Sequence, residues 1–204
     1  MAVLKLAVLI SGRGSNLQAL IDATAKPDYP AKIVAVISNV PDVAGLDRAK
    51  TAGIPTQVVN HRDFKSREEF EKALDAKLVE AGAQLVCLAG FMRLLTPWFV
   101  DRWTDRLINI HPSLLPAFPG LDTHKQALDY GVKLAGCTVH FVRAKMDHGP
   151  IILQAAVPVL SYDSESDLAA RVLAAEHEIY PVAVRLIAEN RVNVINEKVL
   201  VTEA

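Results

Sequence analysis

The sequence has little cysteine and almost no net charge. Its two cysteines, Cys87 and Cys137, lie in apolar runs without CxxC spacing, which argues against a disulfide scaffold or a zinc site and predicts reduced, buried thiols in a cytoplasmic protein. The histidines also lack the spacing of zinc ligands, so we expect no metal. The formal net charge of -1 offers no general attraction for nucleic acid or a membrane, and neither is expected as a partner. An anionic ligand must therefore be held by a local site.

Apolar residues, in contrast, are abundant. With 204 residues, of which 51% are hydrophobic, the chain can form one large core. Apolar runs predict strands at 3–10, 33–38, 56–59, 84–89, 134–142 and 151–159, one more that ends at Leu107-Ile108, and a small hairpin at 192–201. Helical patterns lie at 17–21, 45–52, 66–82 and 123–130, and the longest opens at Ser164 and Asp167. This alternation predicts an α/β fold, a doubly wound, mostly parallel twisted sheet of the Rossmann-like kind, in a single domain, 1–204.

The first predicted strand ends in a glycine loop, Ser11-Gly-Arg-Gly-Ser-Asn16, and a helical pattern follows. Such a turn points free backbone N–H groups and the positive end of a helix at one place, which suits a phosphate. The loop lacks the third glycine of the dinucleotide fingerprint and the Lys-Ser/Thr pair of nucleoside triphosphate sites. We therefore interpret Gly14, Ser15 and Asn16 as the cradle of a phosphate monoester. The alternative is a turn that needs glycine only for its geometry.

A polar pair, Asn109 and His111, follows Leu107-Ile108, and Pro112 and Pro116 prevent a helix there. In an extended chain the two side chains leave the same face. An amide donor beside an imidazole that can carry a proton suits a carbonyl that becomes a tetrahedral oxyanion. The alternative is that Asn109 caps a turn while His111 packs against the prolines.

Four other features are candidates, each with an ordinary explanation. Asp147, in a polar loop, would favour a charged imidazole if it lay beside His111, but loop aspartates usually form turns. Arg67, in the first turn of a helix, suits a ligand carboxylate or solvent. The segment 90–95 follows a strand end, where open α/β sheets bind ligands, but Met92 and Leu94 equally suit a core. Glu176 borders the apolar stripe of the longest helix and suits solvent or a ligand.

Four motifs, taken in order, resemble a known family. They are Ile10-Ser-Gly-Arg-Gly-Ser-Asn-Leu17, Leu88-Ala-Gly-Phe-Met-Arg93, Asn109-Ile-His-Pro-Ser-Leu-Leu-Pro116 and Asp147-His-Gly-Pro150. Together they are similar to phosphoribosylglycinamide formyltransferases of purine biosynthesis, within the wider folate-dependent formyltransferases. The resemblance implies transfer of the formyl group of the co-substrate 10-formyltetrahydrofolate to the amino group of glycinamide ribonucleotide, without a metal.

The resemblance also implies roles for particular residues. The catalytic residues would be Asn109, His111 and Asp147, with His111 as general acid, and the ribonucleotide phosphate would lie on Gly14, Ser15 and Asn16 with Glu176 as a further polar contact. The folate contacts would be Arg67, Met92, Arg93, Leu94, Leu95, Asn109, Arg143 and Asp147. The chain would then divide into a ribonucleotide phosphate-binding half, 1–107, and a catalytic and folate-binding half, 108–204, in a monomer or homodimer. Asp122 and His148 depart from the family pattern, and His148 stands in the folate loop where glycine is usual.

Two other functions remain open at this point. A formyltetrahydrofolate hydrolase would need the same three catalytic residues, with water as the nucleophile. A non-catalytic module that binds a phosphate ligand could use the same fold, because a fold does not establish a function. Transfer to an initiator methionyl-tRNA is disfavoured, since the sequence has neither a further C-terminal domain nor a basic surface.

Overall fold

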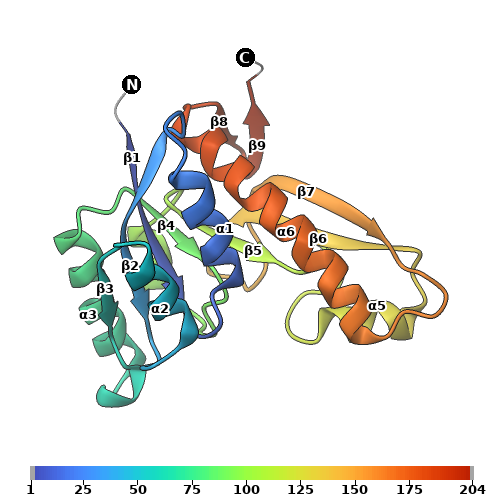
Figure 1. The fold of residues 1–204 in the computed structure, drawn as a ribbon, viewed down its shortest axis with the longest axis horizontal. Helices are drawn as coiled ribbons and strands as arrows, with labels where there is room; N and C mark the ends of the chain where they lie inside the picture. The colour runs from blue at the N-terminus through green and yellow to red at the C-terminus, as the bar shows by residue number, and fades with distance from the viewer. Residues whose placement is uncertain (1–2, 203–204) are drawn as a thin grey trace.

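The computed structural model describes residues 3–202 and is organised around one seven-stranded sheet (Figure 1). Its strands are β1 (Leu4–Ile10), β2 (Ala31–Ser38), β3 (Thr56–Val58), β4 (Leu85–Leu88), β5 (Leu107–His111), β6 (Leu134–Phe141) and β7 (Ile151–Pro158). The order across the sheet is β3-β2-β1-β4-β5-β6-β7. Neighbours pair in parallel from β3 to β5, whereas β6 pairs antiparallel with both β5 and β7. The predicted doubly wound, mostly parallel sheet in one small domain is confirmed.

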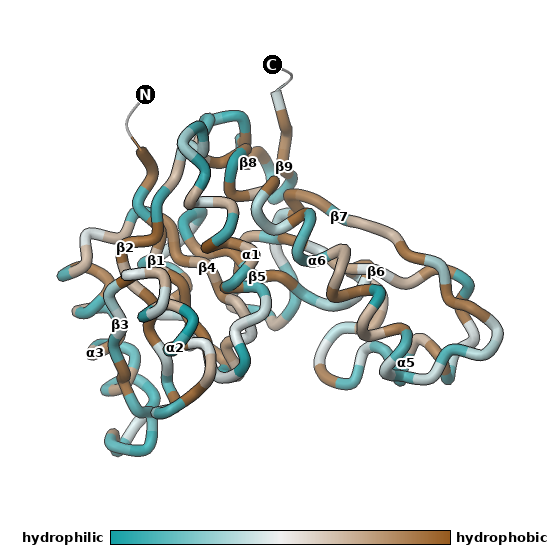
Figure 2. The backbone as a smooth tube through the Cα atoms, in the orientation of Figure 1, coloured by the Kyte–Doolittle hydropathy of each residue, from teal (hydrophilic) through white to brown (hydrophobic). Residues whose placement is uncertain are grey.

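Helices cover both faces of this sheet. They are α1 (Ser15–Thr24), α2 (Ala44–Thr51), α3 (Arg67–Glu80), α4 (Pro97–Arg102), α5 (Thr123–Tyr130) and α6 (Glu165–Ala188), with a short 3-10 helix, η1 (His61–Asp63), and a terminal hairpin, β8 (Val192–Ile195) with β9 (Lys198–Val201). One apolar cluster joins the sheet to α1, α2 and α6, and a second joins it to α3 and α4. Alternate residues of β5 divide between them, with Ile108 in the first cluster and Leu107 in the second. The central strands are accordingly apolar, while many outer turns are polar (Figure 2).

Helix α4 has no counterpart among the predicted elements. It is only six residues long, and Pro97 occupies its first turn, so no apolar period could reveal it. It is held against α3 by Asp75, whose carboxylate accepts hydrogen bonds from Arg102 Nε at 2.6 Å and Trp103 Nε1 at 3.0 Å. The buried indole N–H is therefore paired, as buried donors normally are.

Strand β5 ends three residues later than predicted. We expected it to end at Leu107-Ile108, but it continues through His111 because β6 provides an antiparallel partner for its last residues. Asn109 pairs with His140 and His111 with Thr138. The polar pair therefore lies within the strand, where ladder hydrogen bonds fix its backbone more firmly than a strand end would.

The glycine loop is fixed by a close backbone approach to α2. Gly14 has φ +70° and precedes the first residue of α1. A Cβ atom on Gly14 would lie 2.8 Å from the Cα of Gly45, whose N–H donates a 3.0 Å hydrogen bond to the carbonyl of Gly12. Glycine is required at position 14 both for the left-handed backbone and for this contact.

Gly14→Ala should lower the free energy of unfolding by about 1–3 kcal/mol, since the left-handed backbone and the short contact both oppose a methyl group. Gly12→Ala is the matched control, because a Cβ atom there meets nothing within 4 Å. Urea unfolding of the two variants and the parent measures the difference. Equal stability of the two variants would contradict the close approach.

Candidate active site

The structure brings together the three side chains predicted to be catalytic. His111 is buried and the side chain of Asp147 is 12% exposed, and Nδ1 of His111 lies 3.4 Å from Oδ1 of Asp147. The other ring nitrogen, Nε2, lies 3.2 Å from the carbonyl oxygen of Phe118. The second oxygen of Asp147 accepts a 2.7 Å hydrogen bond from the N–H of Gly120. Both nitrogens of His111 thus face acceptors, an arrangement that suits an imidazolium ion.

Asn109 contacts a second histidine, His140, which lies on the neighbouring strand β6. The sequence does not indicate which face of the sheet the His140 side chain occupies. Its Nδ1 lies 2.9 Å from the carbonyl of Phe141, so it must carry the proton, and Nε2 is left as the acceptor. The Nδ2 of Asn109 lies 3.4 Å from this Nε2. Burial lowers the pKa of His140, although the bond to the Phe141 carbonyl opposes the shift. One amide hydrogen of Asn109 therefore points at His140, and the other remains available to a substrate.

Asp147 is brought to His111 by a connection that begins at the opposite end of β5. The N–H of Val142, just past the end of β6, donates to the carbonyl of Leu107 at the start of β5. Asp147 nevertheless contacts His111 at the other end of β5. The 142–150 connection therefore runs back along β5, so that a strand, its following loop and this connection all meet at His111.

The glycine loop has the free donors expected of an anion site. The N–H of Gln18 is the first in α1 to bond to a preceding carbonyl, that of Gly14, at 3.0 Å, so the N–H groups of the first helical residues have no partner inside the helix. Asn16 donates a 2.6 Å hydrogen bond from Nδ2 to Oε2 of Glu176 on α6. Glu176 is buried, not exposed, and burial raises the pKa of its carboxyl, an effect that Asn16 partly offsets. Asn16 and Glu176 lie on opposite sides of the predicted division at residue 107.

The predicted folate contacts are spread more widely. Met92 and Leu94 are 71% and 57% exposed, so they are surface residues and not part of a core. Arg67 is exposed at the first position of α3. The guanidinium group of Arg143 is bound to Asp105 and Glu197, each at 2.8 Å, and any contact of this residue with folate must come from its backbone or require those ion pairs to open.

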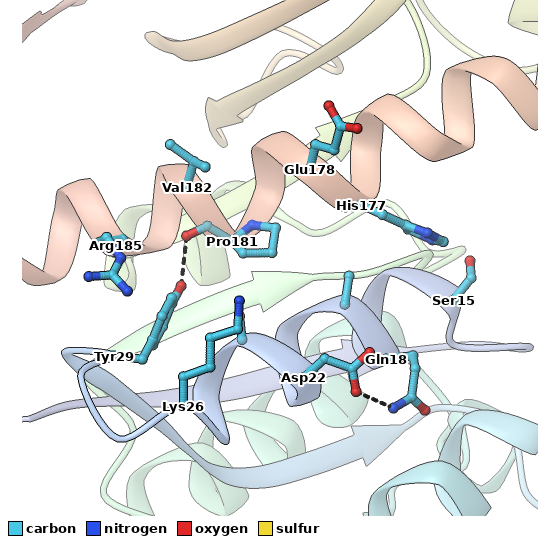
Figure 3. A pocket seen from close by; sticks show the side chains of 12 residues that line it. Ser15, Gln18, Asp22, Lys26, Tyr29, His177, Glu178, Pro181, Val182 and Arg185 are labelled. Atoms are coloured by element: carbon cyan, nitrogen blue, oxygen red, sulfur yellow. Dashed lines mark hydrogen bonds between the residues drawn. The ribbon is translucent and has the colours of Figure 1, made fainter.

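A cavity of about 530 Å³ lies between α1 and α6, and His111 is not among the residues that line it. Figure 3 shows Ser15 and His177 at one end of it and Tyr29, Lys26 and Arg185 at the other. It meets the glycine loop only at Ser15, and none of the three predicted catalytic residues lines it. The Nε2 atom of His177 is buried there without a hydrogen-bond partner among the described residues.

Between residues 3 and 202, no three or more histidine, cysteine, aspartate or glutamate side chains are grouped so as to hold a metal ion. Over the same stretch, none of the helices combines the length and the apolar character needed to cross a membrane.

Comparison with known proteins decides the family. Residues 4–184 match the family model described as formyl transferase. The chain belongs to the formyl transferase family. It is 48% identical over 188 residues to the phosphoribosylglycinamide formyltransferase of Escherichia coli, and the match covers 92% of this chain and 89% of that protein. A crystal structure of glycinamide ribonucleotide transformylase 1 from Symbiobacterium toebii superposes with a TM-score of 0.96 at 49% identity, covering 98% and 95% of the two chains.

The chain is also similar to part of a longer protein. The chain is 55% identical over 188 residues to the human trifunctional purine biosynthetic protein adenosine-3, and the match covers 92% of this chain but only 19% of the human protein. The chain thus spans about a fifth of the length of that relative. The predicted resemblance to phosphoribosylglycinamide formyltransferases, enzymes that transfer a formyl group in purine biosynthesis, is confirmed by these matches.

Two features of this site were not predicted from the sequence. They are the contact of His140 with Asn109 and the burial of Glu176. His140 gave no signal, because a histidine in an apolar strand is more often a core residue. The burial of Glu176 was detectable, since Leu168, Val172, Glu176 and Tyr180 follow one another at four-residue spacing and so share one face of α6. That spacing predicts a buried position, and only its acidic side chain suggested otherwise.

The buried His140 predicts an acid-sensitive fold. Its folded-state pKa is lowered below the usual histidine value of ~6.5, so the unfolded chain binds more protons, and the stability present above that pH is lost as pH falls through the folded-state pKa. Burial also lowers the pKa values of His124 and His177, which add to the effect. His140→Gln should therefore reduce the dependence of unfolding free energy on pH, by at most ~1.4 kcal/mol per pH unit.

Urea unfolding at several pH values between about 5 and 8 measures this dependence. Asn193→Gln is the control, because Asn193 is exposed and carries no titratable group, so its replacement should leave the slope unchanged. The same slope in His140→Gln as in the parent would show that this imidazole does not titrate on unfolding.

Proposed function

We propose that this chain transfers the formyl group of 10-formyltetrahydrofolate to the amino group of glycinamide ribonucleotide, with Asn109, His111 and Asp147 as its catalytic residues. The observation that carries the proposal is the meeting of these three side chains at the end of β5, with His111 within 3.4 Å of Asp147 and an amide hydrogen of Asn109 still free. An amide donor, an imidazole and an orienting carboxylate are the groups that acyl transfer to an amine requires.

The ribonucleotide would occupy the glycine loop. Its phosphate accepts hydrogen bonds from the backbone around Gly14, Ser15 and Asn16 at the positive end of α1. Glu176, held by Asn16, then faces the hydroxyl groups of the ribose. A buried carboxylate with room for further hydrogen bonds binds hydroxyl groups well, because charged hydrogen bonds are stronger than neutral ones.

The folate would approach from the exposed segment of Met92, Arg93, Leu94 and Leu95 and from the 143–147 loop, with Arg67 near its carboxylate tail. Apolar side chains that remain exposed after a strand end are available to cover an aromatic ring system. This arrangement delivers the formyl group to Asn109 and Asp147, which the family resemblance also assigns to the folate.

The chemistry follows from these positions. The amine nitrogen attacks the formyl carbon, and the carbonyl oxygen becomes an oxyanion that Asn109 and charged His111 stabilise. The bond between the formyl carbon and the folate nitrogen then breaks. That nitrogen gains a proton from His111, directly or through water, and the neutral imidazole of His111 then accepts the proton that the attacking amine loses. Asp147 keeps His111 charged and oriented through Nδ1, so Nε2 is the nitrogen that exchanges the Phe118 carbonyl for the substrate.

The first test is the release of tetrahydrofolate from 10-formyltetrahydrofolate, measured with and without glycinamide ribonucleotide. Release in the parent should require the ribonucleotide. Asn109→Ala should lower kcat by about 10²–10³-fold, the usual cost of one oxyanion donor. Asn193→Ala, an exposed change of the same kind in β8, should leave kcat unchanged.

His111→Ala separates the proposed function from its alternatives. Loss of ribonucleotide-dependent release in this variant supports transfer, since the general acid is then missing. Release by the parent without ribonucleotide would indicate a hydrolase. Binding of both ligands with no release at all, even in the parent, would indicate a non-catalytic module.

Glu176→Gln tests the ribonucleotide contact. Loss of a charged hydrogen bond to the ribose, worth about 1.5–3 kcal/mol, should raise the KM for glycinamide ribonucleotide about tenfold or more and leave kcat nearly unchanged. Because burial raises the pKa of Glu176, the stability it contributes is lost as pH rises through its folded-state pKa, so the variant should be the more stable protein at high pH. An unchanged KM would contradict the contact.

A further inference from the structure

The proposed folate segment, 91–95, is attached to the rest of the molecule at few points. Within the described part of the chain, the N–H of Met92 is the one backbone donor of this segment that has a hydrogen-bond partner, the hydroxyl Oγ of Ser11 at 2.8 Å. The next anchor is Thr96, whose N–H and hydroxyl both donate to the fully buried Glu71. Phe91 and Leu95 pack against the second apolar cluster, whereas Met92 and Leu94 are mostly exposed, so the hydrogen bond to Ser11 is what fixes the middle of the segment.

Ser11 is itself firmly held. Its hydroxyl donates a 2.5 Å hydrogen bond to Oδ1 of Asn39, which is buried at the end of β2. Its N–H donates to the carbonyl of Gly90 at 3.1 Å, so the ends of β1 and β4 are joined at this residue. The single hydroxyl proton points at Asn39, and the oxygen is therefore free to accept the Met92 N–H. Ser11 is also the first residue of the glycine loop.

We infer that Ser11 is a positioning residue that couples the two substrate sites, so that a phosphate on the glycine loop strengthens folate binding at residues 91–95. The inference rests on the proposed function for the identity of the two ligands. A phosphate bound by residues 14–16 restricts the loop and with it Ser11, and the Ser11 hydroxyl fixes Met92. Binding that orders a shared element lowers the cost of ordering it for the second ligand. The Glu71 anchor lacks this link, because it does not touch the glycine loop.

The test measures binding without chemistry. The dissociation constant of tetrahydrofolate is determined by calorimetry with and without saturating glycinamide ribonucleotide, and the ratio of the two values gives the coupling. In the parent the ribonucleotide should tighten tetrahydrofolate binding about fivefold or more, the lower end of typical couplings. In Ser11→Ala the ratio should fall to nearly one, because Met92 loses its partner on the loop.

Two controls separate coupling from general loosening of the segment. Thr96→Val weakens the Glu71 anchor but keeps Ser11, so tetrahydrofolate should bind more weakly while the ratio stays at the parent value. Ser161→Ala removes an exposed hydroxyl far along the chain and should change neither quantity. If Ser11→Ala does not fold, Ser11→Cys keeps the shape of the side chain with a slightly larger volume and a much weaker hydrogen-bonding group, and it should give the same loss of coupling.

The outcomes are distinct from those of the activity test. A ratio in Ser11→Ala equal to that of the parent, or a parent ratio of one, would overturn the inference even if turnover is normal. A parent without turnover that still shows Ser11-dependent coupling would contradict the catalytic proposal and leave the coupling standing. Failure of the parent to bind either ligand would overturn both.

Discussion

The site depends above all on the buried contact between His111 and Asp147. Polar side chains with little access to water need hydrogen-bond partners, and here Asp147 has the N–H of Gly120 while His111 has the carbonyl of Phe118. Both of these backbone groups belong to the loop that follows β5. The pair therefore holds that loop and the 142–150 connection together, and neither can move far without exposing an unpaired polar group.

The reversal of one strand makes this contact possible. In a fully parallel sheet the chain would leave β6 at the same edge as it leaves β5. Because β6 is antiparallel, it ends beside Leu107, and the connection to β7 includes a return along β5 to His111 before β7 begins beside His140. Asp147 lies on that return. The fold thus brings an acid from an antiparallel turn to residues at the carboxyl end of a parallel strand, which the usual rule for ligand sites in open sheets does not foresee.

Local chemistry explains which parts of this architecture could be predicted. The glycine loop could be predicted because Gly14 serves a left-handed backbone that few other residues adopt, and the long helices because their apolar period is sustained. Helix α4 could not, since six residues carry no period. The true end of β5 could not either, because the ladder with β6 depends on a partner distant in sequence. Ser11 shows the same limit: its hydroxyl contacts Asn39 and Met92, and nothing adjacent to it in the sequence indicates either partner.

The two histidines near Asn109 need different surroundings. His111 lies beside the carboxylate of Asp147, whereas His140 is buried. His140 can hold the amide of Asn109 only while its Nε2 is unprotonated, and burial lowers the pKa of His140 in that direction. His111, in the proposed mechanism, must carry a proton under the same conditions, and Asp147 supplies the compensating charge. Two imidazoles near one reacting carbonyl can be kept in opposite charge states only by different surroundings. If His140 were protonated, its Nε2–H would turn the carbonyl end of Asn109 toward it. The donor that the oxyanion requires would then leave the site, so the neutrality of His140 is as necessary to the proposed reaction as the charge of His111.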